Sequence, residues 1–319
     1  MNKKMLQESQ DALLRWYETN GRHDLAWRNT NDLYHIYISE IMLQQTQVNR
    51  VMEHFYPNFL AKFPTLASLS QTQEEDVLSA WSGLGYYSRA RNIHATAKLC
   101  TTGELPHTME ELQKLPGIGR YTASAVCAFG LNQAVAVVDT NIARVIKRLF
   151  SHAKNDEKAV LKDAESFVNI HMPREHNLAL MDLGSLICTP TNPKCDECPL
   201  NFTCRAKESP ELFTHTKKTE YESLELFLGI CIKQGRIALT KSEGRMYKNM
   251  LTLPNIEPLE EHYITSFKHS YTKYRLTVKL YKVEELACEK VWLEFDEVKN
   301  AHVSSLTKKA ISALEGCDL

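Results

Sequence analysis

The apolar positions in the first two thirds of the chain recur with the period of a helix. Read as a helix, residues 38–48, "ISEIMLQQTQV", place an apolar stripe beside a face with one carboxylate and several amides. The stripe holds Ile38, Ile41, Met42 and Val48, and the neighbouring face holds Glu40, Leu43, Gln44 and Gln47. Few alternating β-branched runs occur before residue 204, so this part is predicted to form helices joined by short loops.

The remaining third of the chain alternates apolar and polar residues instead. The stretch "ELFLGICIKQGRIALTKS" predicts two strands around a Gln234-Gly235 turn, and "SFKHSYTKYRLTVKLYKV" predicts one long strand. A polar stretch containing "THTKKTE" is typical of a linker. We therefore expect a mainly α domain over residues 1–205, a linker over 206–221 and a smaller α+β domain over 222–319.

Composition and charge add three limits. The 319 residues are 43% hydrophobic and 24% charged, which is ordinary for a globular protein, and no long apolar run predicts a membrane helix. The amino terminus predicts an amphipathic surface helix rather than a signal peptide, which favours the bacterial cytosol. Because the net charge is −1, any polyanion would have to be bound by local patches and backbone N–H groups.

The stretch "LPGIGRYTASAVCAFG", residues 115–130, connects a helix capped by Thr108 to a second helix that ends at Gly130. Gly117 and Gly119 allow a tight reversal, and the second helix would offer its amino-terminal N–H groups and dipole to an anion. This predicts a helix-hairpin-helix that binds a DNA phosphate without reading sequence. An ordinary helix–helix turn is the alternative.

Four of the nine cysteines crowd into a short proline-containing loop, "CTPTNPKCDECPLNFTC". They are Cys188, Cys195, Cys198 and Cys204, with the spacing C-x6-C-x2-C-x5-C. An odd cysteine count without a secretion signal argues against a disulfide framework. Four thiolates this close in sequence can hold a [4Fe–4S] cluster or a structural zinc, and the spacing alone does not choose between them.

Taken in order, the Glu-bearing helix, the hairpin, an aspartate and the four cysteines resemble the endonuclease III superfamily of DNA glycosylases. Within it they resemble the MutY adenine DNA glycosylases. The resemblance runs from about Trp16 to Cys204 and includes "LAWR", "SEIMLQQTQV", "GLGYYSRARN", "LPGIGRYTA", "VDTN" and "MDLG". It implies a helix-hairpin-helix glycosylase fold, double-stranded DNA as partner, and a [4Fe–4S] cluster rather than zinc on the four cysteines.

The resemblance also implies a set of catalytic residues. Glu40 matches the glutamate that protonates the purine, and a carboxyl group near apolar side chains can have the raised pKa that such an acid needs. Asp139 matches the aspartate that supports positive charge on the sugar, and its position also predicts a helix N-cap. Asn141 matches a residue beside it. Tyr121 replaces the Schiff-base lysine of bifunctional relatives and is expected to orient Glu40, which implies a monofunctional enzyme.

Further matches are expected to contact DNA. Gln45 matches a glutamine that inserts into the base stack, and Tyr86 a tyrosine wedged beside the opposing base. Residues matching the base pocket are Leu25, Trp27, Arg28, Leu43 and Thr46. Candidates for phosphate contacts are Arg89, Arg91, Arg144, Lys147 and Arg148. Core packing for the aromatic and apolar residues, and a solvated face for the charges, are the alternatives.

The chain departs from the family in both parts. Leu178 stands where a glutamine or glutamate usually binds the flipped adenine, so one discriminating contact is lost, and Thr140 stands in the usual place of a glycine. The last third resembles, more weakly, the Nudix-like domain that recognises 8-oxoguanine. No Nudix catalytic box is present, so no pyrophosphatase activity is expected. Its Phe-Ser-His recognition loop is matched by Tyr271, Thr272 and Lys273.

These features lead to one main hypothesis with alternatives. A monomeric, monofunctional glycosylase would flip adenine out of mispairs with 8-oxoguanine or guanine and hydrolyse its N-glycosidic bond. A related glycosylase with a changed target is the first alternative, since Leu178 and Lys273 depart from the family. A non-catalytic iron–sulfur DNA-binding protein is disfavoured by Glu40 and Asp139, and lyase activity is disfavoured by Tyr121.

Overall fold

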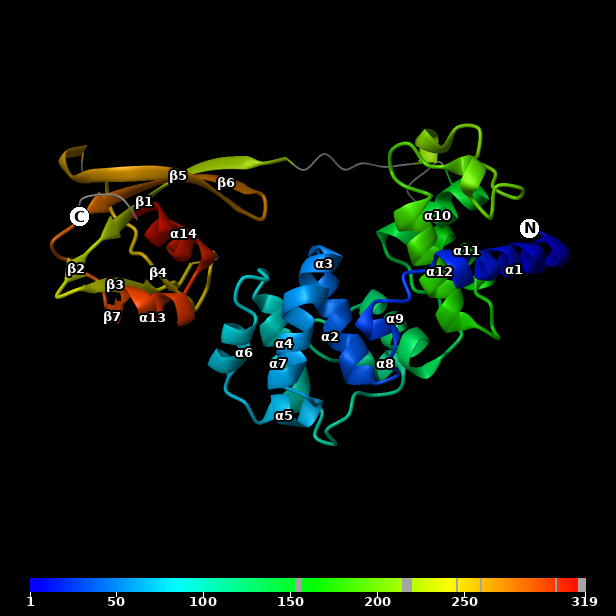
Figure 1. Ribbon diagram of the computed structural model, residues 1–319, viewed down its shortest axis with the longest axis horizontal. Helices are drawn as coiled ribbons and strands as arrows, with labels where there is room; N and C mark the ends of the chain where they lie inside the picture. The colour runs from blue at the N-terminus through cyan, green and yellow to red at the C-terminus, as the bar shows by residue number, and fades with distance from the viewer. Residues whose placement is uncertain (153–155, 214–219, 245, 259, 302, 315–319) are drawn as a thin grey trace. The chain divides into compact units, whose positions relative to one another are not determined.

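The computed structural model describes residues 1–152, 156–213, 220–244, 246–258, 260–301 and 303–314 (Figure 1). The chain divides into two compact units. The first is Met1–Thr72 with Ser88–Thr216, and the second is Gln73–Tyr87 with Lys217–Leu319. The division near residue 216 lies inside the predicted linker 206–221, of which 214–219 fall outside the described residues, as do 315–319. The sequence did not predict that residues 73–87 would join the second unit.

The first unit is helical, as the apolar period predicts. Its α-helices are α1 (Lys3–Asn20), α2 (Leu33–Leu43), α3 (Val48–Arg50), α4 (Tyr56–Lys62), α5 (Leu66–Ser70), α7 (Ser88–Leu99), α8 (Met109–Leu112), α9 (Arg120–Leu131), α10 (Thr140–Phe150), α11 (Glu157–Phe167) and α12 (Pro173–Leu186). Shorter turns are η1 (Ala26–Arg28), the π-helical η2 (Val51–Phe55), η3 (Cys195–Glu197) and η4 (Pro210–Phe213).

The core of the first unit joins α1, α9, α10, α11 and α12. Leu13, Ile146 and Leu183 are fully buried in it, and each such side chain stabilises the fold by about 1.5–3 kcal/mol. Gly184 lets α12 approach α10 closely, because a Cβ atom there would lie 2.7 Å from the Cβ of Asn141. The packing of the core therefore fixes where the amino-terminal turn of α10 lies.

The Glu40 helix ends earlier than the sequence predicts. α2 stops at Leu43, and Gln45 has a φ of 56°, which no helix can contain. The Arg89 guanidinium accounts for this end, since it donates to the carbonyl oxygens of Ile41, Met42 and Gln44 at 2.6–3.1 Å. The prediction of one helix across residues 38–48 is wrong, and the turn it missed exposes Gln45.

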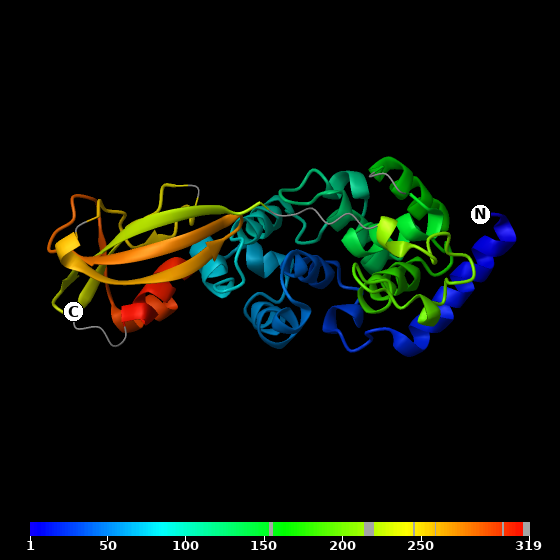
Figure 2. The same cartoon turned by 90° about the horizontal axis from the view of Figure 1, so that it is seen from above.

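The second unit contains two small sheets. Its elements are α6 (Glu74–Ala80), β1 (Glu222–Ile230), β2 (Ile232–Lys233), β3 (Arg236–Lys241), β4 (Leu251–Thr252), η5 (Glu260–His262), β5 (Tyr263–Tyr271), β6 (Tyr274–Lys282), β7 (Val291–Glu294), α13 (Phe295–Asn300) and α14 (Ser305–Leu314). One sheet has the order β1-β6-β5, with β1 parallel to β6, and its strands lie side by side in both views (Figures 1 and 2). The other sheet pairs β3 with β2, β4 and β7.

Two hairpins test the strand predictions. The Gln234-Gly235 turn between β2 and β3 is confirmed, with both residues at positive φ. The single long strand predicted for "SFKHSYTKYRLTVKLYKV" is wrong, because β5 and β6 are separate antiparallel strands. The chain reverses at Thr272, whose φ is 50°, and Lys273. Alternation continues on both sides of so short a turn, so the sequence pattern conceals it.

Candidate active site and cysteine loop

An open cavity of about 1170 Å³ lies in the first unit, between the carboxyl end of α2 and the amino ends of α9 and α10. It is lined by the predicted residues Leu25, Trp27, Arg28, Glu40, Leu43, Gln45, Thr46, Tyr121, Asp139, Asn141 and Leu178. Residues separated by more than a hundred positions in the sequence therefore meet at one place. The cavity is large enough to admit a nucleotide base.

Glu40 is nearly buried at this cavity, with 6% of its surface exposed. Its Oε2 accepts a hydrogen bond of 2.6 Å from the Tyr121 hydroxyl. Burial raises the pKa of Glu40 to about 7, and the nearby Asp139 carboxyl adds to the rise, whereas the Tyr121 hydrogen bond and Arg28 oppose it. The carboxyl group can thus carry and release a proton near neutral pH.

Asp139 is the N-cap of α10, as predicted. Its Oδ1 accepts from the Ile142 amide at 2.6 Å, and its Oδ2 accepts from Asn141 Nδ2 at 3.1 Å. Burial raises the pKa of Asp139, and these hydrogen bonds hold the rise in check. The carboxylate is therefore fixed in direction and faces the same cavity as Glu40.

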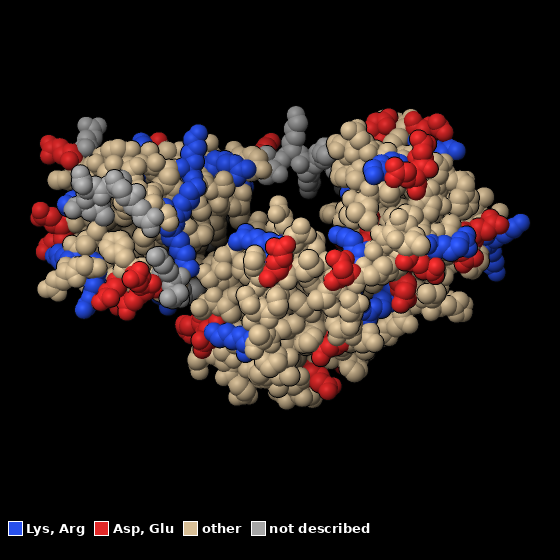
Figure 3. Space-filling view, viewed as in Figure 1, with Lys and Arg blue, Asp and Glu red and all other residues tan. Residues whose placement is uncertain are grey.

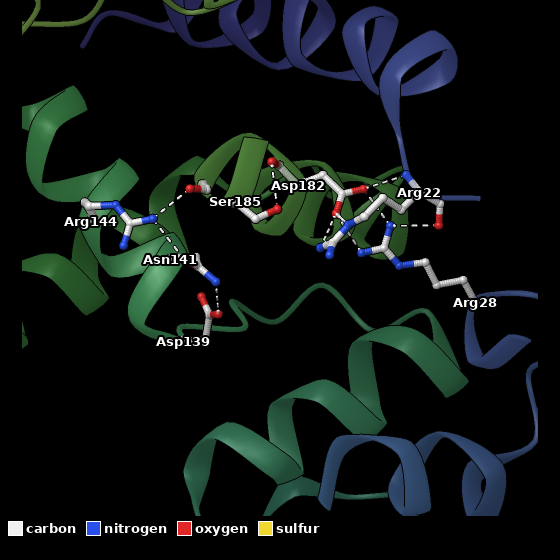
Figure 4. A network of polar contacts seen from close by, with 8 residues as sticks. Arg22, Arg28, Asp139, Asn141, Arg144, Asp182 and Ser185 are labelled. Atoms are coloured by element: carbon white, nitrogen blue, oxygen red, sulfur yellow. Dashed lines mark hydrogen bonds and ion pairs between the residues drawn. The ribbon is translucent and has the colours of Figure 1, made fainter. Parts of the chain in front are cut away.

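Asn141 is held in turn by Arg144. The Arg144 guanidinium donates to Asn141 Oδ1 at 2.9 Å, to the Gly184 carbonyl at 2.7 Å and to the Cys188 carbonyl at 2.8 Å. Figure 4 shows this arrangement beside the Asp139 carboxylate. Arg144 thus fixes the first turn of α10 against α12 and the start of the cysteine loop.

A further acidic group, Asp182 of α12, holds two arginines that line the cavity and escaped the sequence analysis. The Asp182 carboxylate is fully buried and binds the guanidinium groups of both Arg22 and Arg28 at 2.6–2.9 Å (Figure 4). The paired arginines lower the pKa of Asp182 below its usual value. The available signal was an aspartate inside "MDLG", in an otherwise apolar helical stretch. Asp182 holds Arg28 in the cavity wall.

Two more of the expected phosphate-binding arginines, Arg89 and Arg148, have structural roles. Arg89 is 7% exposed and binds the carbonyl oxygens at the end of α2. Arg148 is 2% exposed and donates to Cys188 Sγ at 3.2 Å and to the Thr189 carbonyl at 2.7 Å. The prediction of phosphate contacts is therefore wrong for both. A guanidinium can donate hydrogen bonds to several carbonyl groups at once, so a charged arginine can be buried when such acceptors surround it.

The four predicted cysteines line one small cavity at the end of α12. None of them forms a disulfide. Burial raises the pKa of Cys195, Cys198 and Cys204, that of Cys198 to about 12, whereas the Arg148 guanidinium acts to lower the pKa of Cys195 and Cys204. No three His, Cys, Asp or Glu side chains of the described residues are arranged to hold a single metal ion. The four thiols therefore line one shared space, as a group bound by several cysteines requires.

The predicted hairpin joins α8 to α9. Gly117 has a φ of 73° and lies against the Asn92 side chain, so only glycine fits there. Gly119 is the N-cap of α9, no side chain caps it, and a Cβ atom there would meet nothing within 4 Å. The open amino end of α9 is what an anion site on a helix requires.

Most of the other predicted DNA contacts are exposed, and Tyr271 is partly buried. Gln45 lies on the turn after α2, at the rim of the cavity. Tyr86 is 42% exposed, has a φ of 49° and belongs to the second unit. Tyr271, Thr272 and Lys273 form the tip of the β5–β6 hairpin in that same unit, where Lys273 is paired with Glu222 of β1.

Comparison with known proteins identifies the family. Residues 38–169 match the HhH-GPD superfamily of base excision DNA repair proteins, and residues 188–204 match the iron-sulfur binding domain of endonuclease III. An adenine DNA glycosylase of Buchnera aphidicola subsp. Schizaphis graminum is 36% identical over 257 residues, which are 77% of this chain and 74% of that protein. The chain belongs to the MutY-type adenine DNA glycosylases. As a member, it is a base excision repair hydrolase of N-glycosyl bonds that acts on DNA.

A second sequence relative and a solved structure are also similar to this chain. The adenine DNA glycosylase of Buchnera aphidicola subsp. Baizongia pistaciae is 44% identical over 208 residues, which are 63% of this chain and 59% of that protein. A solved structure of a thermostable thymine-DNA glycosylase superposes with a TM-score of 0.60 and 30% identity, over 64% of this chain and 97% of that one. Both family models match within the helical part of this MutY-type chain.

Surface features add little to the identification. On the face in Figure 3, basic and acidic side chains are interspersed on both units, in keeping with the net charge of −1. Among the described residues, no helix combines the length and apolar character needed to cross a bilayer. Attraction to DNA in this glycosylase must therefore come from local groups such as the open end of α9.

Proposed function

We propose that the chain is a monofunctional glycosylase that releases adenine mispaired with 8-oxoguanine or guanine. The observation that carries this proposal is the Glu40–Tyr121 pair at the cavity, with a carboxyl pKa of about 7. An acid with this pKa is protonated in a large fraction of molecules at neutral pH and still transfers its proton readily. Its buried position limits competing proton exchange with bulk water.

The reaction requires the site to neutralise negative charge on the leaving base and then to stabilise positive charge on the sugar. Glu40 donates its proton to a ring nitrogen of the flipped adenine, so the N-glycosidic bond breaks and neutral adenine leaves with the bonding electrons. The sugar is left as an oxocarbenium ion, which the Asp139 carboxylate stabilises across the same cavity. Water adds to the sugar carbon and loses a proton, which restores the Glu40 acid and leaves an abasic site.

Two side chains set up these roles. Tyr121 donates its hydroxyl hydrogen to Glu40 Oε2, which leaves Oε1 to carry the transferable proton. Asn141 binds Asp139 Oδ2 and fixes the carboxylate in place. A tyrosine at position 121 cannot form a Schiff base with the sugar, so no strand cleavage through this position follows base release.

The cysteine loop is proposed to hold a [4Fe–4S] cluster. Cys188, Cys195, Cys198 and Cys204 would each supply one thiolate, and such a cluster would supply a rigid anchor for the end of α12. The residues of the second unit are proposed to form a Nudix-like lesion-recognition domain, with Tyr271, Thr272 and Lys273 facing the base opposite adenine. The protein is proposed to act as a monomer in the bacterial cytosol, where its DNA substrate lies.

A changed target is the second candidate, and one observation favours it. Leu178 lines the cavity and is 6% exposed, so an apolar side chain lies where relatives place a purine-binding polar group. Arg22 and Arg28, which Asp182 holds, line the same cavity and would be polar alternatives for reading a base edge. A different base, such as the thymine named for the similar solved structure, would then be the substrate.

Single-turnover base release distinguishes the two candidates. Duplexes would carry one central pair: adenine opposite 8-oxoguanine, guanine or cytosine, or thymine or uracil opposite guanine. Adenine release opposite 8-oxoguanine and guanine that is absent from Glu40→Gln protein is the expected result. Glu40-dependent release of thymine or uracil, with no adenine released, would replace the proposed substrate with the second candidate.

A further inference from the structure

Tyr247 occupies an unusual place in the second unit. It lies in the loop between β3 and β4, with 7% of its surface exposed and a φ of 55°. A bulky residue rarely adopts this left-handed conformation, so surrounding contacts must hold it there. Ser242 supplies some of them, since its hydroxyl donates to the Met246 carbonyl at 2.7 Å and its amide to the Met250 carbonyl at 2.9 Å.

The hydroxyl and the ring of Tyr247 both contact the β5–β6 hairpin, and the hydroxyl also contacts α14. Its hydroxyl lies 2.7 Å from Nε2 of His269 on β5 and 3.1 Å from Oγ of Ser305, the first residue of α14. Its ring packs on the ring of Tyr271 at the end of β5, with 4.7 Å between centroids and 53° between planes. Tyr247 therefore packs beneath the hairpin tip and supports Tyr271.

The same core also receives the segment that carries Tyr86. Tyr87, the next residue, packs against the core cluster that includes Tyr247, and its hydroxyl accepts from the Gly83 amide at 3.5 Å. Burial raises the pKa of Tyr247 to about 12, and both Tyr271 and Tyr87 add to the rise, as close neighbours do. The Lys308 ammonium of α14 donates to Ser82 Oγ at 3.0 Å and ties the segment down further.

We propose that Tyr247 is a positioning residue that sets Tyr271 of the hairpin, and Tyr86 through Tyr87, for stacking against the base opposite the excised adenine. The inference rests on the proposed function, which it deepens by naming what shapes recognition of the opposing base. Stacking depends on the depth and tilt of a ring, and a half-exposed hairpin tip would otherwise sample many positions. A ring beneath Tyr271 with a tethered hydroxyl restricts both.

Two variants separate the ring from the hydroxyl. Tyr247→Phe keeps the packing on Tyr271 and removes the bonds to His269 and Ser305, whereas Tyr247→Leu removes the ring as well. Tyr281→Phe is the matched control, because Tyr281 is a buried tyrosine of the same unit that packs on Tyr263 at the opposite end of the β5–β6 pair. All three are compared with wild type in thermal unfolding.

The decisive readout is the ratio of single-turnover adenine release opposite 8-oxoguanine to release opposite guanine. We expect Tyr247→Leu to lower this ratio by about threefold to tenfold, as for loss of a positioned aromatic contact, and Tyr247→Phe to lower it less. Tyr281→Phe should leave it unchanged. A purely structural role would slow both substrates together, so an unchanged ratio in Tyr247→Leu would overturn the proposal.

A second measurement keeps this result separate from the proposed function. If wild type releases no adenine, the proposed function fails, and equilibrium binding of Glu40→Gln protein to duplexes with 8-oxoguanine or guanine then decides on Tyr247. Tighter binding to 8-oxoguanine that Tyr247→Leu abolishes would support the positioning role. Equal binding to both duplexes, or a preference that survives Tyr247→Leu, would rule it out.

Discussion

The cavity of the first unit and the hairpin tip of the second unit are built in opposite ways. At the cavity, Glu40 accepts from Tyr121 and Arg28 binds the buried Asp182, partners 81 and 154 positions away in sequence, whereas Asp139 is held by Asn141 of its own helix. At the tip, Thr272 and Lys273 are exposed and lie on a two-residue turn. A group that transfers a proton needs a fixed geometry, whereas exposed turn residues make few contacts that constrain their identity. Tyr271, Thr272 and Lys273, the proposed counterparts of the family's Phe-Ser-His loop, each differ from it.

The first way to break this comparison is Glu40→Gln. The variant keeps an acceptor for the Tyr121 hydroxyl but has no proton to give, so we expect base release to fall by about 10²–10⁴-fold. Single-turnover release from an adenine–8-oxoguanine duplex measures it. Residual release within threefold of wild type would mean that the acid lies elsewhere.

Stability provides the control for that variant. Because the folded chain holds the Glu40 proton up to about pH 7, whereas the unfolded chain loses it near its ordinary pKa of 4.5, wild type loses stability as pH rises between these values. Glu40→Gln should therefore be more stable than wild type at pH 8, on the order of 1–3 kcal/mol, with a smaller gain at pH 5. Thermal unfolding at both pH values tests the sign.

Asp139→Asn has the next largest expected effect. Asparagine is as good an N-cap as aspartate, so α10 should remain intact while the negative charge opposite the sugar disappears. We expect release to slow by about 10²–10³-fold with less than about 1 kcal/mol lost from the free energy of unfolding. A large loss of stability with normal release would show that the residue is only a cap.

How far the sequence predicts the molecule follows the same division. The helical first unit, the N-cap at Asp139 and the clustering of the four cysteines agree with expectation, because short-range patterns specify them. The hydrogen bond between Tyr121 and Glu40, 81 positions apart, was expected only from the family resemblance. The end of α2 at Leu43 depends on Arg89, 46 positions further along the chain, and no local pattern reveals such a partner. The structural roles of the buried Arg89 and Arg148 also depend on distant partners, so their charge in the sequence does not reveal these roles.

The hairpin shows a different limit. Tyr271 and Tyr274 pair across a turn of Thr272 and Lys273, and neither turn residue is the glycine or asparagine that usually marks a tight reversal. The inclusion of residues 73–87 in the second unit was also beyond the sequence, since it depends on Tyr87 entering a core formed 140 or more positions later. Long-range packing decides both features.

Lys273→Gln tests the exposed hairpin tip, where we expect the smallest effect. The Lys273 ammonium is about half exposed and paired with Glu222, and exposed pairs of this kind contribute little. We expect less than about threefold change in release and little change in thermal stability. Glu222→Gln is the matched control, and a tenfold loss in Lys273→Gln alone would mean that the ammonium contacts DNA directly.

The most direct test of the central claim, a buried Glu40 poised near neutral pH as the proton donor, is a pH profile of single-turnover adenine release between pH 5.5 and 9. Because the protonated form is the active one, the rate should hold at low pH and fall about tenfold per unit above a midpoint near 7. Tyr121→Phe removes a hydrogen bond that favours the ionised form, so its midpoint should move upward. A wild-type rate that stays flat to pH 9 would contradict the account.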